Sequence, residues 1–210
     1  MEFKKLPVNE EFGILANAER VDKVMKALKE HGFEVQTVTD AVAAQKVVLS
    51  LIPEGSEVMT MVSQTLDQSG IAAAINESGK YQSVRNKLTS MGQGAITKEK
   101  KNLGFSPAYA LGSVHAITEQ GEVLVASRSG SQLPAYIIGA ETVILVVSTT
   151  KLVKDLNDGL KRINEYSYPL EDERAFKAYG VNSGVYDILI EQQSVPGRTK
   201  IILVGEKLGF

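Results

Sequence analysis

Hydrophobic residues recur at two different spacings along the chain, and segments of the two kinds alternate almost throughout. In the first segment Val21, Val24 and Leu28 lie at helical spacing, and Gly32 follows as a stop signal. The same reasoning predicts helices over residues 17–33, 41–52, 63–78, 149–166 and 170–180. Alternating or continuously apolar runs predict strands over residues 33–38, 56–62, 108–118, 121–127, 142–147 and 200–205.

Details within this pattern refine the predicted fold. The third helix is expected to break near Gly70, and residues 80–105 are polar and helical only in pieces. The run TVILVV at 142–147 has no polar alternation, so we expect both of its faces to be buried. Strands that alternate with helices are typical of an α/β protein with a largely parallel sheet. We predict a single domain over residues 1–210, in which residues 1–15 can form an N-terminal extension.

Composition narrows the functional classes. The chain has no cysteine and two histidines, which excludes thiol nucleophiles, cysteine-ligated iron–sulfur clusters and His-rich zinc sites; we predict no metal site. The net charge of −2 and the absence of a basic tract argue against nucleic-acid binding. No apolar run approaches the roughly 20 residues of a membrane span, and the first residues lack the apolar core of a secretory signal. We therefore expect a cytoplasmic protein that binds neither nucleic acid nor membranes.

The first candidate site follows the strand predicted at 56–62. Ser63, Gln64 and Thr65 open the next helix, where backbone amides point outward and favour anions. Ligands of open α/β sheets bind beyond the carboxyl ends of the strands. These residues are therefore candidates for holding a phosphate or carboxylate. The alternative, which the spacing alone favours, is that Ser63 or Thr65 only caps its helix.

The second candidate site is the run GSVHAITE. Its small residues Gly112, Ser113 and Thr118 can line a ligand. His115 and Glu119 are four residues apart, which places both on one face of a straight strand. Such a pair can act as acid and base, and Glu119 alone can act as a nucleophile. The alternative, a polar turn with a hydrogen-bonded histidine, is again favoured by spacing alone.

The third candidate site is the run SRSGSQ, which follows a predicted strand. Its amides and hydroxyls can bind an anion or simply connect a strand to a helix. The residues concerned are Ser129, Gly130, Ser131 and Gln132. Lys151 follows the run TVILVV and either contacts a ligand or pairs with Asp155 on a helix; the pair is the simpler interpretation. The sequence leaves open whether Arg128 or Arg85 reaches the same edge.

The stretch GSVHAITEQGEVLVASRSGSQLPAYIIGAETVILVVSTTKLVKDLNDGLKRI resembles the LUD, or lactate-utilisation, domain family. That family typically has a small-residue strand, an A-[IL]-T-E-x-G motif, a G-[NS]-[RQ] turn and an x-K-[IL]-V-x-D-[LI] segment. The matching positions are Ala116 to Glu119 with Gly121, Gly130 to Gln132, Lys151 to Val153, Asp155 and Arg162. The run from Ser63 to Ile71 and the closing IILVGEKLGF also fit, so the resemblance extends over residues 15–210.

The resemblance implies a fold similar to the sugar-phosphate isomerase and CoA-transferase superfamily: a three-layer, Rossmann-like α/β sheet, largely parallel, with helices on both faces. Some family members take part in oxidising lactate to pyruvate with iron–sulfur partner proteins, and others have no assigned role. Two features depart from the family pattern. The segment before the final strand lacks the cysteines that many relatives carry, and His115 stands where many members have Asn.

Three functions are consistent with these observations, in decreasing order of preference. The first is a LUD-domain protein of organic-acid metabolism that binds a small anionic metabolite or a phosphate-bearing cofactor of unknown identity. It would rely on redox partner proteins for any lactate chemistry. The second is an enzyme similar to CoA transferases or sugar-phosphate isomerases, with Glu119 as nucleophile or base. The third is a non-catalytic subunit of a multi-protein complex. Related folds often pair, which leaves a homodimer open.

Overall fold

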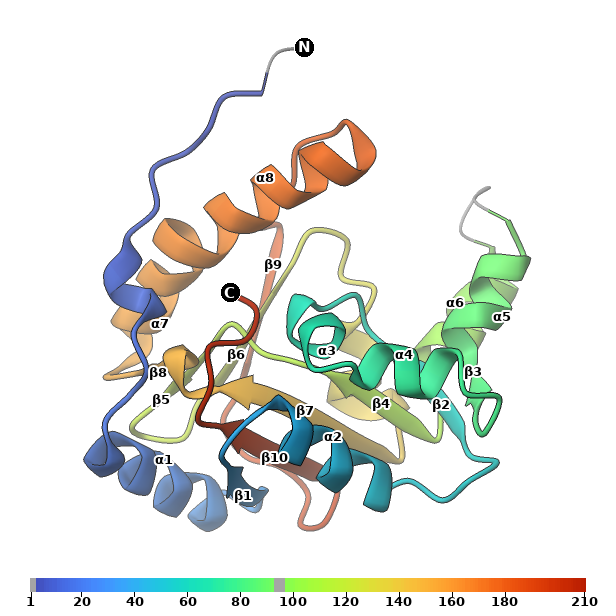
Figure 1. Ribbon diagram of the computed structural model, residues 1–210, viewed down its shortest axis with the longest axis horizontal. Coiled ribbons are helices and arrows are strands. Elements are labelled where there is room, and N and C mark those ends of the chain that lie inside the picture. Colours follow the sequence, from blue (N-terminus) through green and yellow to red (C-terminus); the bar gives the residue numbers. More distant parts are fainter. Residues whose placement is uncertain (1–2, 93–96) are drawn as a thin grey trace.

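The computed structural model describes residues 3–92 and 97–210, and a parallel β-sheet lies at its centre (Figure 1). Within the described chain this main sheet has six strands, and every neighbouring pair is parallel. In spatial order they are Glu34–Val38 (β1), Thr199–Val204 (β10), Thr142–Ser148 (β7), Tyr109–Gly112 (β4), Glu57–Thr60 (β2) and Gln82–Ser83 (β3). The predicted α/β class with a largely parallel sheet is confirmed.

Capping residues set where several helices begin. The α-helices of the described chain are Ala18–Glu30 (α1), Ala41–Ser50 (α2), Gln64–Gln68 (α3), Ile71–Asn76 (α4), Val84–Ser90 (α5), Lys98–Phe105 (α6), Leu156–Arg162 (α7) and Tyr168–Tyr179 (α8). Asn17 caps α1 and accepts a hydrogen bond from the Arg20 amide. Asp40 caps α2 and accepts a hydrogen bond from the Ala43 amide. Gly70, with φ of +70°, separates α3 from α4 where the break was predicted.

The two faces of the main sheet are buried in two different cores. On β7, Ile144 and Val146 face the core that contains α2 and α4. The alternate residues Val143, Leu145 and Val147 face the opposite core, which contains α1. Successive strand residues point to opposite faces, so a strand buried on both sides has no polar alternation. The layers of helix, sheet and covering elements match the three-layer, Rossmann-like arrangement that the resemblance implies.

A second sheet covers part of the α1 side of the main sheet. Its four described strands, in spatial order, are Leu152–Val153 (β8), Ala116–Thr118 (β5), Val123–Ser127 (β6) and Asp187–Glu191 (β9). Ile117 and Val125 point into the core shared with the main sheet. On the outer side α7 packs so closely that a Cβ at Gly159 would lie 2.9 Å from Leu124 Cδ2. Strands β5 and β6 are therefore buried between the main sheet and α7, whereas β9 lies at an exposed edge.

The single strand predicted over residues 108–118 is wrong, because the chain changes sheets within it. Gly112 ends β4, and a Cβ there would lie 1.7 Å from the phenol oxygen of Tyr136. Three residues later the amide of His115 donates to the carbonyl of Leu124, which starts the pairing of β5 with β6. Because β4 and β5 are both buried, the apolar pattern continues from one strand to the other. Periodicity alone therefore does not show that the chain changes sheets.

The helix predicted over residues 149–166 begins much later than expected. Thr149–Lys151 form a 3₁₀ turn (η3), β8 comes next, and α7 starts only after Asp155. Asp155 is extended and accepts a hydrogen bond from the Asp158 amide at 3.0 Å, which makes it the cap. The segment predicted as one helix thus combines a buried strand with a shorter helix, and Leu160 on that helix is exposed.

The helix predicted over 170–180 is the end of a longer helical run. The turn Ile163–Ser167 (η4) is π-helical and joins α7 directly to α8, so Pro169 does not mark a helix start. Proline lacks an amide hydrogen and crowds the carbonyl four residues earlier. The wider π turn immediately before it relieves both constraints. The continuous run carries α8 across the carboxyl end of the main sheet (Figure 1).

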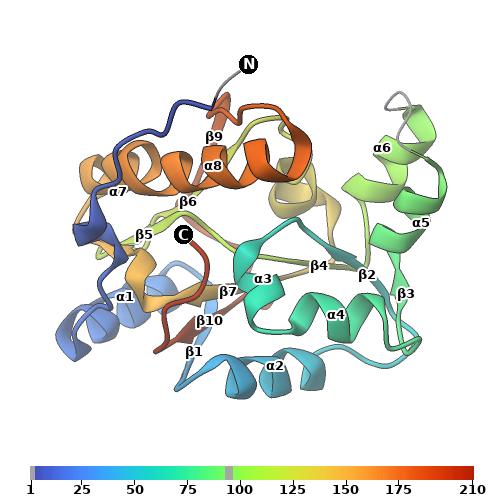
Figure 2. The same ribbon diagram turned by 45° about the horizontal axis from the view of Figure 1, so that its top comes forward.

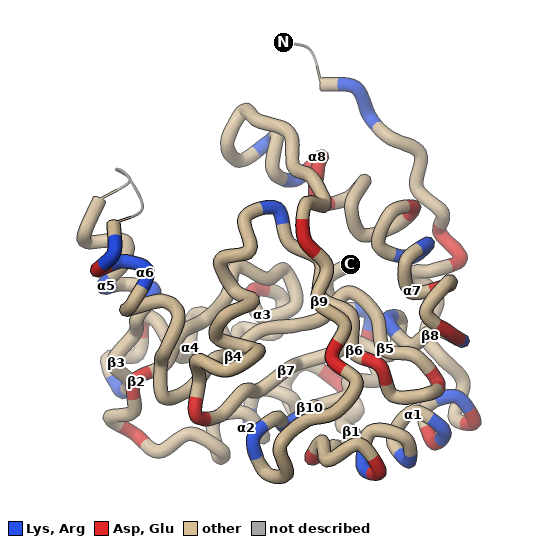
Figure 3. The backbone as a smooth tube through the Cα atoms, turned by 180° about the vertical axis from the view of Figure 1, so that it is seen from behind, with Lys and Arg blue, Asp and Glu red and all other residues tan. Residues whose placement is uncertain are grey.

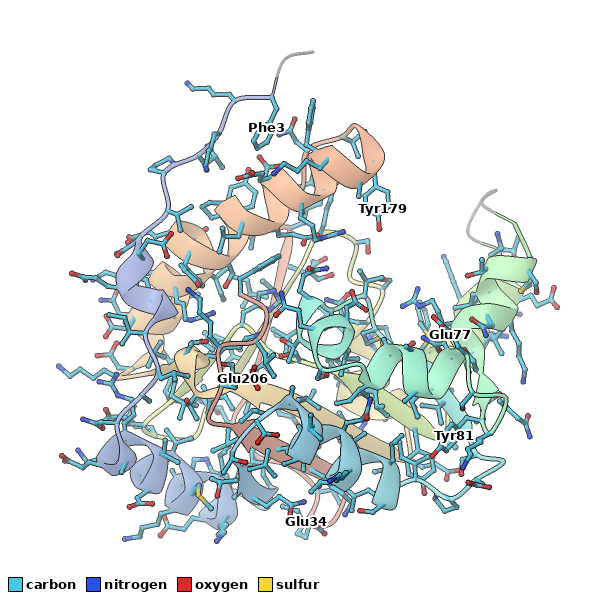
Figure 4. The ribbon with its side chains drawn as sticks, viewed as in Figure 1. Phe3, Glu34, Glu77, Tyr81, Tyr179 and Glu206 are labelled. Carbon is cyan, nitrogen blue, oxygen red and sulfur yellow. The ribbon has the colours of Figure 1, made fainter. Side chains whose placement is uncertain are left out.

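The remaining segments cover the edges of the molecule. Residues 80–105 contain β3, α5 and α6 in their described part, and residues 93–96 lie outside the described residues. Residues 131–139 contain the π-helical turn Ala135–Gly139 (η2). The N-terminal segment includes the 3₁₀ helix Glu10–Gly13 (η1), and Phe3 lies against α8 with its ring centroid 5.0 Å from that of Phe176 (Figure 4). No described helix combines the length and apolar character needed to cross a bilayer.

Candidate functional site

Loops at the carboxyl ends of the main-sheet strands enclose a cavity of about 280 Å³. Its walls come from residues 61–65 after β2, residues 113–115 after β4 and Lys151 after β7. The segment after β6, the start of α8 and Phe210 complete it. Figure 2 shows α8 at the top, with α3, the C-terminus and the sheet beneath it. Open α/β sheets bind ligands at this position.

Lys151 presents a buried amine to this cavity. The residue is 2% exposed, and its Nζ lies 3.1 Å from Thr65 Oγ1 and 3.0 Å from Ser113 Oγ. Among the described residues no carboxylate pairs with it. The predicted pair with Asp155 is wrong, since Lys151 lies before the helix that Asp155 caps. Burial, and then the positive charge of Arg162, hold the pKa of Lys151 well below its ordinary value of 10.5.

The hydroxyl groups around Lys151 are themselves fixed by the backbone. Thr65 Oγ1 donates to the carbonyl of Leu208 at 3.4 Å, which leaves its lone pairs for the amine. Gly209 follows with φ of +61°, and a Cβ there would lie 2.3 Å from Thr65 Oγ1. Ser63 accepts from the Leu66 amide and caps α3, so the capping alternative describes Ser63 but not Thr65.

Arg162 places a second positive charge behind the cavity wall. It is fully buried, and its Nε donates to the Thr150 carbonyl at 3.2 Å. Its Nη1 donates to the carbonyl of His115 and, at 3.0 Å, to Ser167 Oγ. Its Nη2 has no acceptor among the described residues. Burial lowers the pKa of Arg162 to about 10, so the guanidinium stays charged at neutral pH.

His115 lines the cavity as a neutral ring. The amide of Ala126 donates to its Nδ1 at 3.0 Å, which places the ring hydrogen on Nε2 in the neutral form. Burial, followed by the positive charges of Lys151 and Arg162, lowers the pKa of His115 to about 3 from 6.5. At neutral pH the ring can therefore donate a hydrogen bond from Nε2 without carrying charge.

The outer part of the cavity is formed by residues 127–132 and α8. Ser127 Oγ donates to Gln132 Oε1 at 2.9 Å and accepts from the Gly130 amide, which fixes the turn. Arg128 lines the cavity, is exposed and has no hydrogen bond or ion pair among the described residues. Arg174 on α8 instead forms two 2.7 Å hydrogen bonds with Glu171. The positive charge of Arg128 is thus left for a ligand.

The cavity brings together most of the residues singled out in the sequence. Those that line it are Ser63, Gln64, Thr65, Ser113, His115, Ser129, Ser131, Gln132 and Lys151. Gly112 supports the wall through its contact with Tyr136, and Gly130 holds the turn after β6. Thr118 is buried and hydrogen-bonds Glu122 within the β5–β6 turn. Of the two arginines left open, Arg128 reaches the cavity, whereas Arg85 donates to the Thr60 carbonyl and does not line it.

Glu119 lies outside the cavity lining. Its carboxylate is 2.9 Å from Arg20 Nε and 3.8 Å from Lys23 Nζ, both on α1. Figure 3 shows basic and acidic residues interspersed along that helix. The two residues expected on one face of a strand therefore have different surroundings, because β5 is short and ends between them. A catalytic role for Glu119 stays a prediction.

Several lining residues have no signal in the sequence that would mark them. Tyr136, Ser167, Tyr168, Glu171, Arg174 and Phe210 belong to this group. Ser167, Tyr168, Glu171 and Arg174 come from η4 and α8, which reach the cavity because the helical run continues through Pro169. Phe210 reaches it from the end of the chain after β10. Arg162 stands within the family motif, but its spacing does not reveal that it is buried without a carboxylate. Among the described residues no group of three or more His, Asp and Glu could hold a metal ion.

Fold and cavity together define the class: a three-layer α/β protein with a hydroxyl-lined, positively charged cavity at the carboxyl edge of its sheet. The sequence model of the LUD domain matches residues 21–204, and the chain belongs to the LUD domain family. A crystal structure of a DUF162 family protein from Deinococcus radiodurans has a similar fold, with a TM-score of 0.57 and 12% identity. The match covers 91% of this chain and 100% of that one. None of the curated proteins compared with the chain matches it.

Proposed function

We propose that the cavity binds a small anionic metabolite, or the phosphate of a cofactor, through Lys151 and Arg128. The observation that carries this proposal is the buried Lys151, which lies on the cavity beside Arg162 without a carboxylate among the described residues. The positive charge of Arg162 and the protonated form of Lys151 are both costly to bury unless they are paired. An anion in the cavity would supply the missing partner, and the hydroxyls of Ser113 and Thr65 would share in holding it.

The size and lining of the cavity support a small ligand. A volume of about 280 Å³ lies at the lower end of the range for small-molecule sites. The family resemblance adds an organic acid as the first candidate, and lactate utilisation as the metabolic setting. Because the chain has no cysteine, any electron transfer in that setting would belong to partner proteins or a bound cofactor.

The first experiment measures thermal unfolding against lactate, pyruvate, inorganic phosphate, a sugar phosphate and CoA. A ligand at a hundred times its dissociation constant should stabilise the protein by roughly 2.7 kcal/mol. The shift should disappear in Lys151→Met and persist in Lys154→Met, because Lys154 is exposed and does not line the cavity. The absence of a shift with every anion, or an equal shift in both variants, would contradict the proposal.

A further inference from the structure

The amine of Lys151 has one tetrahedral position left after its known contacts. Cε occupies one position, and the hydrogen bonds to Thr65 Oγ1 and Ser113 Oγ occupy two more. Since the Thr65 hydroxyl gives its own hydrogen to Leu208, the amine must be the donor in that contact. Lys151 lines the cavity, so the remaining position is the one available to a ligand.

We infer that Lys151 is a nucleophile, and that its amine forms a Schiff base with the carbonyl carbon of a small 2-oxo acid bound in the cavity. This inference rests on the proposed anion site and names the ligand class for it. A 2-oxo acid carries both groups that the cavity can use: a carboxylate for the positive charges and an adjacent carbonyl for the amine. The electron pair of the neutral amine occupies the fourth position.

The surroundings of Lys151 favour this chemistry over a purely ionic role. A nucleophilic lysine must be neutral, and the usual means are burial and a neighbouring cation. Lys151 has both, since it is 2% exposed and lies near the charged Arg162. A structural lysine would instead be expected to have a carboxylate, and the described residues provide none. The positive charges that remain for the carboxylate of the ligand are those of Arg162 behind the wall and Arg128 at the rim.

The step balances without an oxidant or a further reactant. The nitrogen electron pair of Lys151 attacks the carbonyl carbon, a C–N bond forms, and the carbonyl oxygen becomes a hydroxyl. The C–O bond then breaks as the C=N bond forms. The two hydrogens of the amine leave with that oxygen as one water molecule. His115 lines the same cavity and carries a hydrogen on Nε2. This N–H can donate a hydrogen bond to the departing oxygen.

Reductive trapping on the full chain tests the inference. The protein is incubated with pyruvate and sodium cyanoborohydride, and the product is analysed by intact mass and peptide mapping. We expect one adduct per chain, located on Lys151. Lactate, which has the same carboxylate but a hydroxyl in place of the carbonyl, should give none. The adduct should be lost in Lys151→Arg, whose guanidinium is not a nucleophile, and should persist in Lys154→Arg.

Binding measured in parallel separates this inference from the proposed function. If pyruvate or another anion stabilises the protein and no adduct forms on Lys151, the Schiff base is wrong and the anion site stands. Labelling spread evenly over exposed lysines, or an adduct that persists in Lys151→Arg, also overturns it. If no anion binds at all, both proposals fail. A folded Lys151→Arg variant is confirmed by its thermal unfolding, and the mapped adduct on the wild-type chain does not depend on that variant.

Discussion

At the residue scale, Lys151 is surrounded by hydroxyls where a buried cation would normally have a carboxylate. A folded-state pKa below 10.5 means that the unfolded chain binds the extra proton. The free energy of unfolding should therefore rise with pH between the lowered pKa and 10.5. Residues shaped for a ligand often reduce stability in this way.

Replacing Lys151 with Met should consequently stabilise the protein while removing anion binding. We expect the free energy of unfolding at neutral pH to increase by about 1 kcal/mol, because the thioether fits a buried site without a charge. Urea unfolding over a pH series measures both effects, since the variant should lack the rise that Lys151 contributes. A clear loss of stability would show that the two hydroxyl contacts outweigh the buried amine.

His115 gives the second prediction at this scale, on the acidic side. Its pKa is about 3 when folded and 6.5 otherwise, so only the unfolded chain takes up its proton within that window. Stability should fall as the pH drops below 6.5, by about 1.4 kcal/mol per pH unit. His115→Asn, the residue that the family resemblance suggests here, can still accept from the Ala126 amide. The variant should fold and lose this slope in urea unfolding; an unchanged slope would contradict the prediction.

At the element scale, the start of α7 depends on one side chain rather than on an apolar stripe. Asp155 accepts from the Asp158 amide and follows the short strand β8. Asp155→Ala should lower the free energy of unfolding by about 1 kcal/mol, as the loss of a helix cap typically does. Chemical denaturation measures the change, and Asp155→Asn, which keeps the capping oxygen, should behave nearly as the wild type.

The junction between β5 and α1 allows a test of the role predicted for Glu119. This carboxylate pairs with Arg20 and Lys23, and its side chain is 19% exposed. Partly exposed pairs contribute little, so Glu119→Ala should cost about 0.5 to 1 kcal/mol of stability. Anion binding, measured by calorimetry, should be unchanged because Glu119 does not line the cavity. A loss of binding with little change in stability would instead favour the enzyme hypothesis.

At the scale of the whole molecule, the cavity joins elements that are far apart along the chain, and binding there should be linked to protons. An anion beside Lys151 favours the charged form of the amine, so its lowered pKa should rise on binding. Lactate binding should therefore take up protons at pH values around and above the lowered pKa, and it should weaken as the pH rises. Calorimetry in buffers of different ionisation enthalpy measures the uptake, and Lys151→Met should abolish it. Binding without proton uptake at any pH would contradict the lowered pKa of Lys151.

The sequence by itself determined the class of the fold and most of the candidate residues. The spacing of apolar residues located α1, β1 and α2, and a continuous apolar run located β7. Gly70 separates α3 from α4 where the break was predicted, and Asp40 caps α2. Ser63 to Thr65 became candidates because ligands of open α/β sheets bind beyond the carboxyl ends of the strands. The predicted helices, strands and helix break that the structure confirms depend on contacts within a few residues of the chain.

Only the tertiary structure decided how those residues are used. The chain changes sheets after Gly112, continues as a helix through Pro169 and returns Leu208 to Thr65. The local pattern of apolar residues does not show these events, because each is decided by contacts between elements that are far apart along the chain. The structure also shows that Lys151 has no carboxylate among the described residues, whereas the sequence offered Asp155 as its partner. Pairing of charges depends on distances between separate elements, and hydrophobic periodicity carries no information about those distances.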